Sequence, residues 1–148
     1  MSEPVVIRNA EERDADAVSA LFTVLGHPCS SEQVRKRIAV FSEAPGHLFQ
    51  VAEVDGAVVG FAAANTVESP RRQGKNGDIS ALAIAESHQR KGIGRRLVRT
   101  IEDWLRSEGA VRVRLTSASH RTETAHRFYP ALGYRQTGVR FDKDLTPP

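Results

Sequence analysis

Two glycines one residue apart, Gly92 and Gly94, form the most informative spacing in the sequence. They follow an apolar run that ends near Ile84 and precede a long amphipathic segment, an order typical of a buried strand, a loop and a helix. The first amide groups of a helix have no partner inside it, and the helix dipole adds positive potential there. Glycine also lets an oxygen atom approach the backbone closely. The segment therefore predicts a site for a phosphate-bearing ligand.

Basic side chains surround the two glycines: Arg90, Lys91, Arg95 and Arg96. The spacing fits neither a Walker loop nor a Rossmann loop, which would need a third glycine where Leu97 stands. Acidic residues are interspersed with the basic ones, and no aromatic residues alternate with the arginines as a stacking surface for bases requires. We therefore expect a phosphorylated small ligand and no nucleic acid.

The strands and helices that must position this loop are predicted from the spacing of apolar residues, which has two periods in this sequence. Apolar residues two apart predict strands, and apolar residues three or four apart predict helices. We expect strands at 5–10, 48–54, 57–64, 78–85 and 111–117, a last strand or hairpin at 134–145, and helices that end near Gly26, Pro45, Gly109 and Gly133. The order β-α-α-β-β-β-α-β-α-β predicts an α/β fold with a mixed sheet and helices on both faces.

Local signals support several of these boundaries. Ser30 and Gln33 have the spacing of a capping box, and Asp55-Gly56 has the residue types of a two-residue hairpin turn. The polar segment 69–77 contains one proline and two glycines, which predicts a loop. Pro130 cannot donate the backbone hydrogen bond of a helix interior, so we expect the last helix to bend there.

Length and composition set broad limits. The 148 residues, of mass 16.2 kDa, predict one domain over 1–148, and the net charge is +3. Cys29 is the only cysteine, so an internal disulfide and a cysteine-rich metal site are excluded, and no other cluster has metal-ligand spacing. The longest apolar run, Val58–Ala64, is too short to span a membrane. The first residues do not have the pattern of a signal peptide, so we expect a cytoplasmic protein.

Three segments together resemble the Gcn5-related N-acetyltransferase (GNAT) superfamily. These are the loop Gln89–Gly94, the preceding strand Leu82–Ile84, and the later Phe-Tyr-x-x-Leu-Gly-Tyr of Phe128–Tyr134. The element order is also that of the superfamily, so the resemblance covers nearly the whole chain. It implies acetyl-CoA as the donor, a primary amine as the acceptor, and direct transfer with no covalent enzyme intermediate.

The resemblance also implies which residues bind CoA. The backbone of Leu82, Ala83 and Ile84 would pair with pantetheine, beside a bulge that separates two parallel strands, and an N–H near Ile84 would polarise the thioester carbonyl. The pyrophosphate would lie on the backbone amides of Gln89, Arg90, Lys91, Gly92, Ile93, Gly94 and Arg95.

Two side chains match catalytic positions of the superfamily. Tyr129 corresponds to the tyrosine that protonates the departing thiolate, although its ring could instead pack only against the sheet. Asp78 lies where some relatives place the carboxylate base, although it could instead cap the turn at 74–77. His120 and His126 are alternative bases.

The acceptor is left open between a small-molecule amine, which the sequence slightly favours, and a peptide N-terminus or lysine. Its identity would depend on residues 21–41, the loop at 68–77 and the tail after Tyr134. A non-catalytic acyl-CoA-binding module on the same fold is the alternative to an enzyme. Members of the superfamily are often dimers, so a homodimer is expected from the resemblance.

Overall fold

The computed structural model describes residues 4–71, 73–116 and 125–146. The chain divides into two compact units, residues 1–115 and residues 116–148. Among the described residues, the first unit contains the sheet, three α-helices and two short 3-10 helices, and the second contains one short α-helix.

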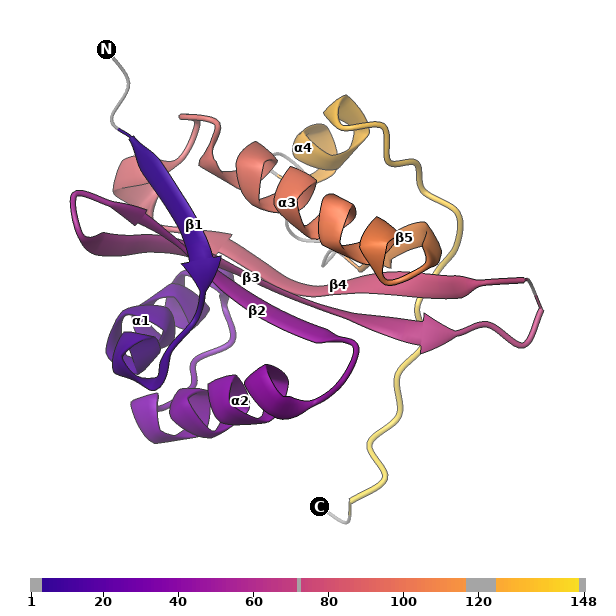
Figure 1. Ribbon diagram of the computed structural model, residues 1–148, viewed down its shortest axis with the longest axis horizontal. Helices are drawn as coiled ribbons and strands as arrows, with labels where there is room; N and C mark the ends of the chain where they lie inside the picture. Colours follow the sequence, from indigo (N-terminus) through magenta and orange to yellow (C-terminus); the bar gives the residue numbers. More distant parts are fainter. Residues whose placement is uncertain (1–3, 72, 117–124, 147–148) are drawn as a thin grey trace. The chain divides into compact units, whose positions relative to one another are not determined.

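A five-stranded sheet forms the centre of the first unit (Figure 1). Its strands, in chain order and also in spatial order, are β1 (Val5–Asn9), β2 (His47–Val54), β3 (Ala57–Glu68), β4 (Lys75–Ile84) and β5 (Ala110–Leu115). Neighbouring strands are antiparallel except β4 and β5, which are parallel. The expected strands of this unit are all present, and β4 begins three residues earlier than the sequence predicts because Lys75–Gly77 pair with both neighbours.

Helices cover both faces of the sheet, as the sequence predicts. In Figure 1, α1 (Ala15–Leu25) and α2 (Ser31–Glu43) lie on one face and α3 (Ile93–Ser107) lies on the other. Two short 3-10 helices, η1 (Glu12–Asp14) and η2 (Glu86–His88), precede α1 and α3. The fold class is thus the expected mixed sheet between two helical layers.

The local boundary signals are confirmed. The Ser30 hydroxyl accepts a hydrogen bond from the Gln33 amide at 3.1 Å, and the Gln33 side chain accepts one from the Ser30 amide at 3.0 Å. Gly26 ends α1 with φ +92°. Asp55 and Gly56 both have positive φ, which is the conformation that a two-residue turn between twisted strands requires.

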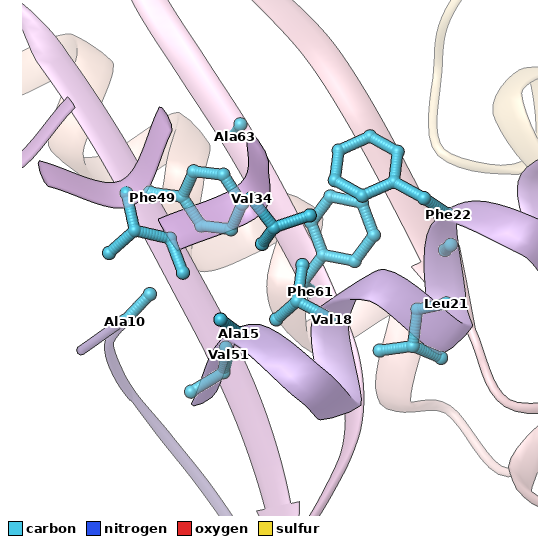
Figure 2. Packing of buried hydrophobic residues seen from close by; sticks show 12 residues of the cluster. Ala10, Ala15, Val18, Leu21, Phe22, Val34, Phe49, Val51, Phe61 and Ala63 are labelled. Carbon is cyan, nitrogen blue, oxygen red and sulfur yellow. The ribbon is translucent and has the colours of Figure 1, made fainter. Parts of the chain in front are cut away.

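The larger hydrophobic core lies between the sheet and the α1–α2 layer (Figure 2). The rings of Phe22, Phe49 and Phe61 form its centre: Phe61 lies 4.7 Å from Phe22 and 5.5 Å from Phe49, measured between ring centroids. Val34 and Ile38 of α2 are fully buried against it, as the helical spacing predicts. This core fixes the position of β3 and, through it, of β4.

The opposite face of the sheet packs against α3. Its buried residues follow the helical period and are Ile93, Leu97, Val98, Ile101 and Leu105. A side chain at Gly77 of β4 could not fit beneath the helix, because a Cβ atom there would lie 2.6 Å from the Leu105 methyl groups. Glycine at this position therefore lets α3 lie close to β4.

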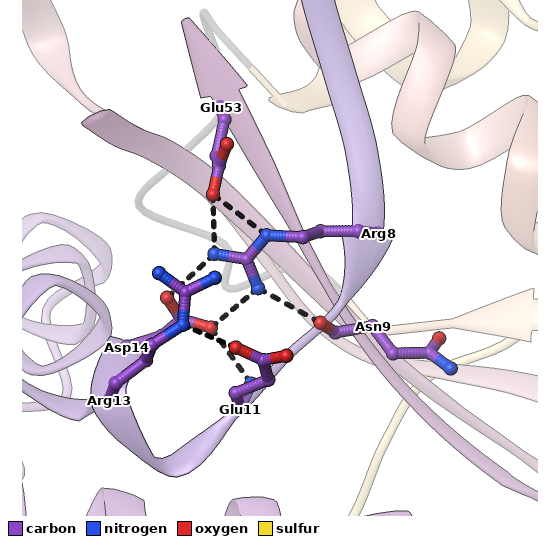
Figure 3. A network of polar contacts seen from close by, with 6 residues as sticks. All are labelled: Arg8, Asn9, Glu11, Arg13, Asp14 and Glu53. Carbon is purple, nitrogen blue, oxygen red and sulfur yellow. Dashed lines mark hydrogen bonds and ion pairs between the residues drawn. The ribbon is translucent and has the colours of Figure 1, made fainter. Parts of the chain in front are cut away.

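An ion-pair network connects the first strand to the start of α1 (Figure 3). Arg8 of β1 donates two hydrogen bonds of 2.8 Å to the carboxylate of Asp14, which is only 4% exposed, and a third of 2.7 Å to Glu53 of β2. Asp14 also accepts the amide of Glu11. The hydrogen bonds from Arg8 lower the pKa of Asp14, although burial acts in the opposite direction.

The second unit contains α4 (Ala125–Ala131) and an extended tail. Pro130 lies inside the helix, which continues to Ala131, and Gly133 follows with φ +93°. The strand or hairpin predicted at 134–145 is wrong, because residues 134–146 form neither strand nor helix. Alternating apolar residues predict a strand only where a neighbouring strand takes up the backbone hydrogen bonds, and in this tail Phe141 is 92% exposed.

Candidate functional site

The two parallel strands β4 and β5 separate partway along β4. Their pairing runs from Lys75 opposite Ala110 to Ile79 opposite Leu115, and β4 then continues to Ile84 with no partner on that edge among the described residues. The last part of β4 therefore has one edge paired with β3 and one open edge.

A β-bulge lies where the strands separate. Ala63 of β3 pairs with Ala81, whereas the next residue, Ala64, pairs with Ile79, so Ser80 is an extra residue in β4. The Ser80 hydroxyl donates a hydrogen bond of 3.2 Å to the Ala63 carbonyl. Bulges bend a strand and increase its local twist, which accounts for the divergence of β4 from β5 at this point.

The open edge presents backbone groups of Leu82 and Ile84. The Ala85 amide bonds to the Val59 carbonyl at 2.8 Å, toward β3, and successive residues of a strand point their backbone groups in opposite directions. The groups of Leu82 and Ile84 thus point away from β3, while the Ala83 side chain is buried in the core. The side-chain amide of Gln89 donates to the Ile84 carbonyl at 3.0 Å, leaving the Ile84 N–H on the open edge.

A short segment connects the end of β4 at Ile84 to the N-terminus of α3 at Ile93. Gly92 precedes the helix with φ +84°, and Arg90 also has a positive φ of 65°. The first backbone hydrogen bond of the helix runs from the Arg96 amide to the Gly92 carbonyl at 3.1 Å. The backbone amides of the first turn, which come before Arg96, therefore have no acceptor within the helix. The side chains of Gln89, Arg90, Lys91 and Arg95 are exposed around them, whereas Ile93 is buried and anchors the turn.

Asp78 lies inside β4 rather than at its start. Its carboxylate accepts a hydrogen bond from Nε of Arg114 at 2.6 Å, an ion pair with the facing residue of β5. The proposed cap of the turn at 74–77 is therefore not its contact. Sequence reasoning missed Arg114, although the alternation in β5 already placed it on one face of that strand.

Tyr129 belongs to the second unit. Its ring contacts those of Phe128 and Tyr134, with centroids 5.0 Å and 5.8 Å away, and its side chain is partly buried. The structure thus brings Leu82–Ile84, Gln89–Arg95 and Asp78 together in one unit, and it places Tyr129 in the other.

The remaining candidates have local contacts. Nδ1 of His47 lies 3.0 Å from the Pro45 carbonyl, and Arg37 donates to the Cys29 sulfur at 2.8 Å. His120 lies outside the described residues, as does the side chain of His126.

In the described part of the chain no three His, Cys, Asp or Glu side chains gather as metal ligands would. None of its helices has the length and apolar character needed to cross a bilayer.

Comparison with known sequences identifies a family. The sequence model of the "Acetyltransferase (GNAT) family" matches residues 15–134, most of the chain. N-acetyltransferase family 8 member 3 of Mus musculus is 34% identical over 93 residues, which are 63% of this chain and 41% of the mouse protein. The chain thus spans about two fifths of the length of this curated relative.

Comparison with solved structures shows the same fold. An aminoglycoside N-acetyltransferase, AAC(6')-Iy, solved in complex with CoA, superposes with a TM-score of 0.83 at 18% identity, covering 99% of this chain and 98% of the other. Glucosamine-6-phosphate N-acetyltransferase from Arabidopsis thaliana gives 0.77 at 20% identity, covering 97% and 100%. At these identities the likeness concerns the fold alone.

Proposed function

Because the chain belongs to the acetyltransferase (GNAT) family, we propose that it transfers the acetyl group of acetyl-CoA to a primary amine. Two features of one unit carry this proposal. The last part of β4 has an open edge, and the loop after β4 leads to the N-terminus of α3, which Gly92 precedes. A ligand with amides at one end and phosphates at the other fits both features.

CoA has this chemistry. Its pantetheine arm contains two amide groups, which can hydrogen-bond to Leu82 and Ile84 as an added strand would. Its pyrophosphate carries negative charge, which the free amides of the first turn of α3 and the exposed Arg90, Lys91 and Arg95 would stabilise. A backbone N–H of this open edge, near Ile84, would then polarise the thioester carbonyl.

The proton transfers fall to Asp78 and Tyr129. The acceptor enters as an ammonium ion and must lose a proton before its nitrogen can attack, and Asp78 is the carboxylate that stands where the two strands separate. Tyr129 would protonate the thiolate that leaves. Both roles are supported by position in the family pattern and are proposals to be tested by substitution.

A small-molecule amine is the favoured acceptor. Two structural neighbours carry names that refer to such substrates, aminoglycosides and glucosamine-6-phosphate. A peptide N-terminus or lysine is the second possibility, which the sequence leaves open.

The test is release of CoA thiol from acetyl-CoA in the presence of aminoglycosides, polyamines, amino acids, amino sugars and peptides. We expect turnover with one class, and we expect Tyr129→Phe to lower kcat at least about tenfold, the usual size of general acid catalysis. Tyr134→Phe is the matched control, because its ring contacts Tyr129 and it also loses one phenol hydroxyl.

Other outcomes would change the proposal. Full turnover by Tyr129→Phe would retain the enzyme and reject this acid. Acetyl-CoA binding, seen as a higher melting temperature, without turnover on any amine would favour a non-catalytic acyl-CoA-binding module. A melting temperature unchanged by acetyl-CoA would show that the loop before α3 has another role.

A further inference from the structure

Four polar residues lie side by side across four strands of the sheet. His47 of β2 pairs with Asn65 of β3, Asn65 pairs with Asp78 of β4, and Asp78 pairs with Arg114 of β5. We call these four residues the polar row. It lies on the face covered by α1 and α2, because Phe61 and Ala63 precede Asn65 at alternate positions and belong to the core on that face.

The polar row lies where α2 ends. The His47 ring packs edge-on against Phe41 in the last turns of α2, with centroids 5.0 Å apart. At the other end of the row, the side chain of Asp78 is 29% exposed and that of Arg114 is 54% exposed. A small molecule can therefore reach the Asp78–Arg114 end.

The ion pair between Asp78 and Arg114 involves one oxygen of the carboxylate and one nitrogen of the guanidinium. Nε of Arg114 bonds to Oδ1 of Asp78 at 2.6 Å. Within the described residues, Oδ2 of Asp78 and both terminal nitrogens of Arg114 have no further partner. The pair thus offers a negative oxygen and, next to it, the planar fork of a guanidinium.

The position of the pair relates it to acetyl transfer. Asp78 opposite Arg114 is the last but one pair before β4 and β5 separate, and the bulge at Ser80 comes two residues after Asp78. In the proposed function pantetheine lies along the open edge that begins at this separation, with its phosphates toward α3 and its thioester end toward the pair. An amine bound by the pair would therefore approach the ligand from its acetyl end.

We propose that the acceptor is an amino acid or a derivative with a free carboxylate beside its amine, bound by Asp78 and Arg114. This inference rests on the proposed function and names its substrate class. The ammonium group would donate to Oδ2 of Asp78, and the carboxylate would accept both terminal N–H groups of Arg114 in the bidentate geometry that arginine favours. His47 and Asn65 would line the rest of the row and contact the side chain.

Charge on this face opposes a polycation. Arg112 lies two residues before Arg114 on the same face of β5, where it pairs with Asn76, so this face of the β4–β5 pair carries two arginines and the one carboxylate of Asp78. A polyamine or aminoglycoside would bring several positive charges to a surface whose local sum is already positive. A zwitterion brings one charge of each sign, and each finds its opposite in the pair.

The reaction balances for such an acceptor. The nitrogen forms a bond to the thioester carbonyl carbon, the C–S bond breaks, and the thiolate leaves with the bonding electrons. Of the two protons that the ammonium group loses, one ends on the CoA thiol and the other leaves through Asp78 to solvent. The carboxylate of the acceptor takes no part in the bond changes, so Arg114 serves binding.

The experiment compares amino acids with their carboxamides as acceptors in the full chain, with spermidine and an aminoglycoside as polycations. We expect amino acids to be the best substrates. Arg114→Gln should raise KM for the amino acid at least about tenfold, and it should lower the ratio of kcat/KM for the amino acid to kcat/KM for the amide by a similar factor. Arg114→Lys, which keeps the charge but loses the fork, should fall between.

Arg112→Gln is the matched control, since it removes the same charge from the same strand face two residues away, and its KM for the amino acid should stay close to the parent value. Melting temperatures of all variants would show that each is folded. A higher kcat/KM for the polycations than for amino acids would overturn this inference and leave acetyl transfer intact. Equal losses of kcat/KM on the amino acid and on the amide in Arg114→Gln would do the same. Failure of acetyl-CoA to bind or turn over with any amine would overturn the proposed function as well.

Discussion

At the scale of single residues, Asp14 shows how a buried charge is kept in this fold. Its carboxylate is almost fully buried but accepts two hydrogen bonds from Arg8 and one from the amide of Glu11. Burial alone would favour the protonated acid, whereas the arginine favours the carboxylate, and the arginine has the larger effect, so the pKa is lowered. A carboxylate with a lowered pKa makes stability depend on pH in a definite direction.

We expect Asp14→Asn to lower the free energy of unfolding at pH 7 by about 2 kcal/mol, because Arg8 loses its charged partner. The contribution of Asp14 is complete above the ordinary pKa of about 4 and is lost as pH falls through the lower pKa of the folded protein. Urea unfolding between pH 7 and pH 3 should therefore show a smaller loss of stability in Asp14→Asn. Asp103→Asn, which removes an exposed partner of Arg106, is the control. Equal pH dependence in the parent and Asp14→Asn would contradict the argument.

At the scale of elements, the start of α3 combines two properties in one turn. Ile93 is buried and holds the turn in place, while Arg95 points to solvent beside the free amides. Folding and ligand binding therefore use different side chains of the same turn. A charge change at Arg95 should separate the two.

We expect Arg95→Glu to raise KM for acetyl-CoA at least about tenfold, since it replaces attraction to the pyrophosphate by repulsion. An acidic residue in the first turn of a helix interacts favourably with the helix dipole, so the melting temperature should not fall. Arg99→Glu makes the same charge change one turn later on an exposed position and should have a smaller effect. Similar KM values for the two variants would argue against phosphate binding at this turn.

At the scale of the whole molecule, one core supports the sheet that carries the candidate site. Phe61 is completely buried and stacks on Phe49, so it joins β3 to β2 and to the helical layer. Phe141, in the tail of the second unit, is exposed. The two phenylalanines therefore measure how unevenly stability is distributed along the chain.

We expect Phe61→Ala to lower the free energy of unfolding by about 3–5 kcal/mol, the cost of a large core truncation. Phe141→Ala should change it by no more than about 0.5 kcal/mol. Chemical denaturation of both variants measures the difference. A large loss in Phe141→Ala would mean that the tail packs against another surface in solution. The cytoplasmic location, the single domain over 1–148 and the homodimer that the sequence suggests stay predictions.

The sequence alone determined the helices, the turns and the loop before α3. The capping box at Ser30 and the glycines around 92–94 act through hydrogen bonds and backbone angles within a few residues, so their effects can be read locally. The apolar periods likewise predicted which faces are buried. The resemblance to a known family, carried by the same loop, followed from these local features.

Only the tertiary structure decided the partner of Asp78, the position of the expected bulge at Ser80 and the absence of a strand in residues 134–146. Each depends on pairing between strands that are distant in the chain. A shift of one residue in register would move every side chain of a strand to the other face, and the sequence pattern of one strand does not specify the register of its neighbour. Asp78 meets Arg114, 36 residues later, because β4 and β5 are held in one register by the core and by α3.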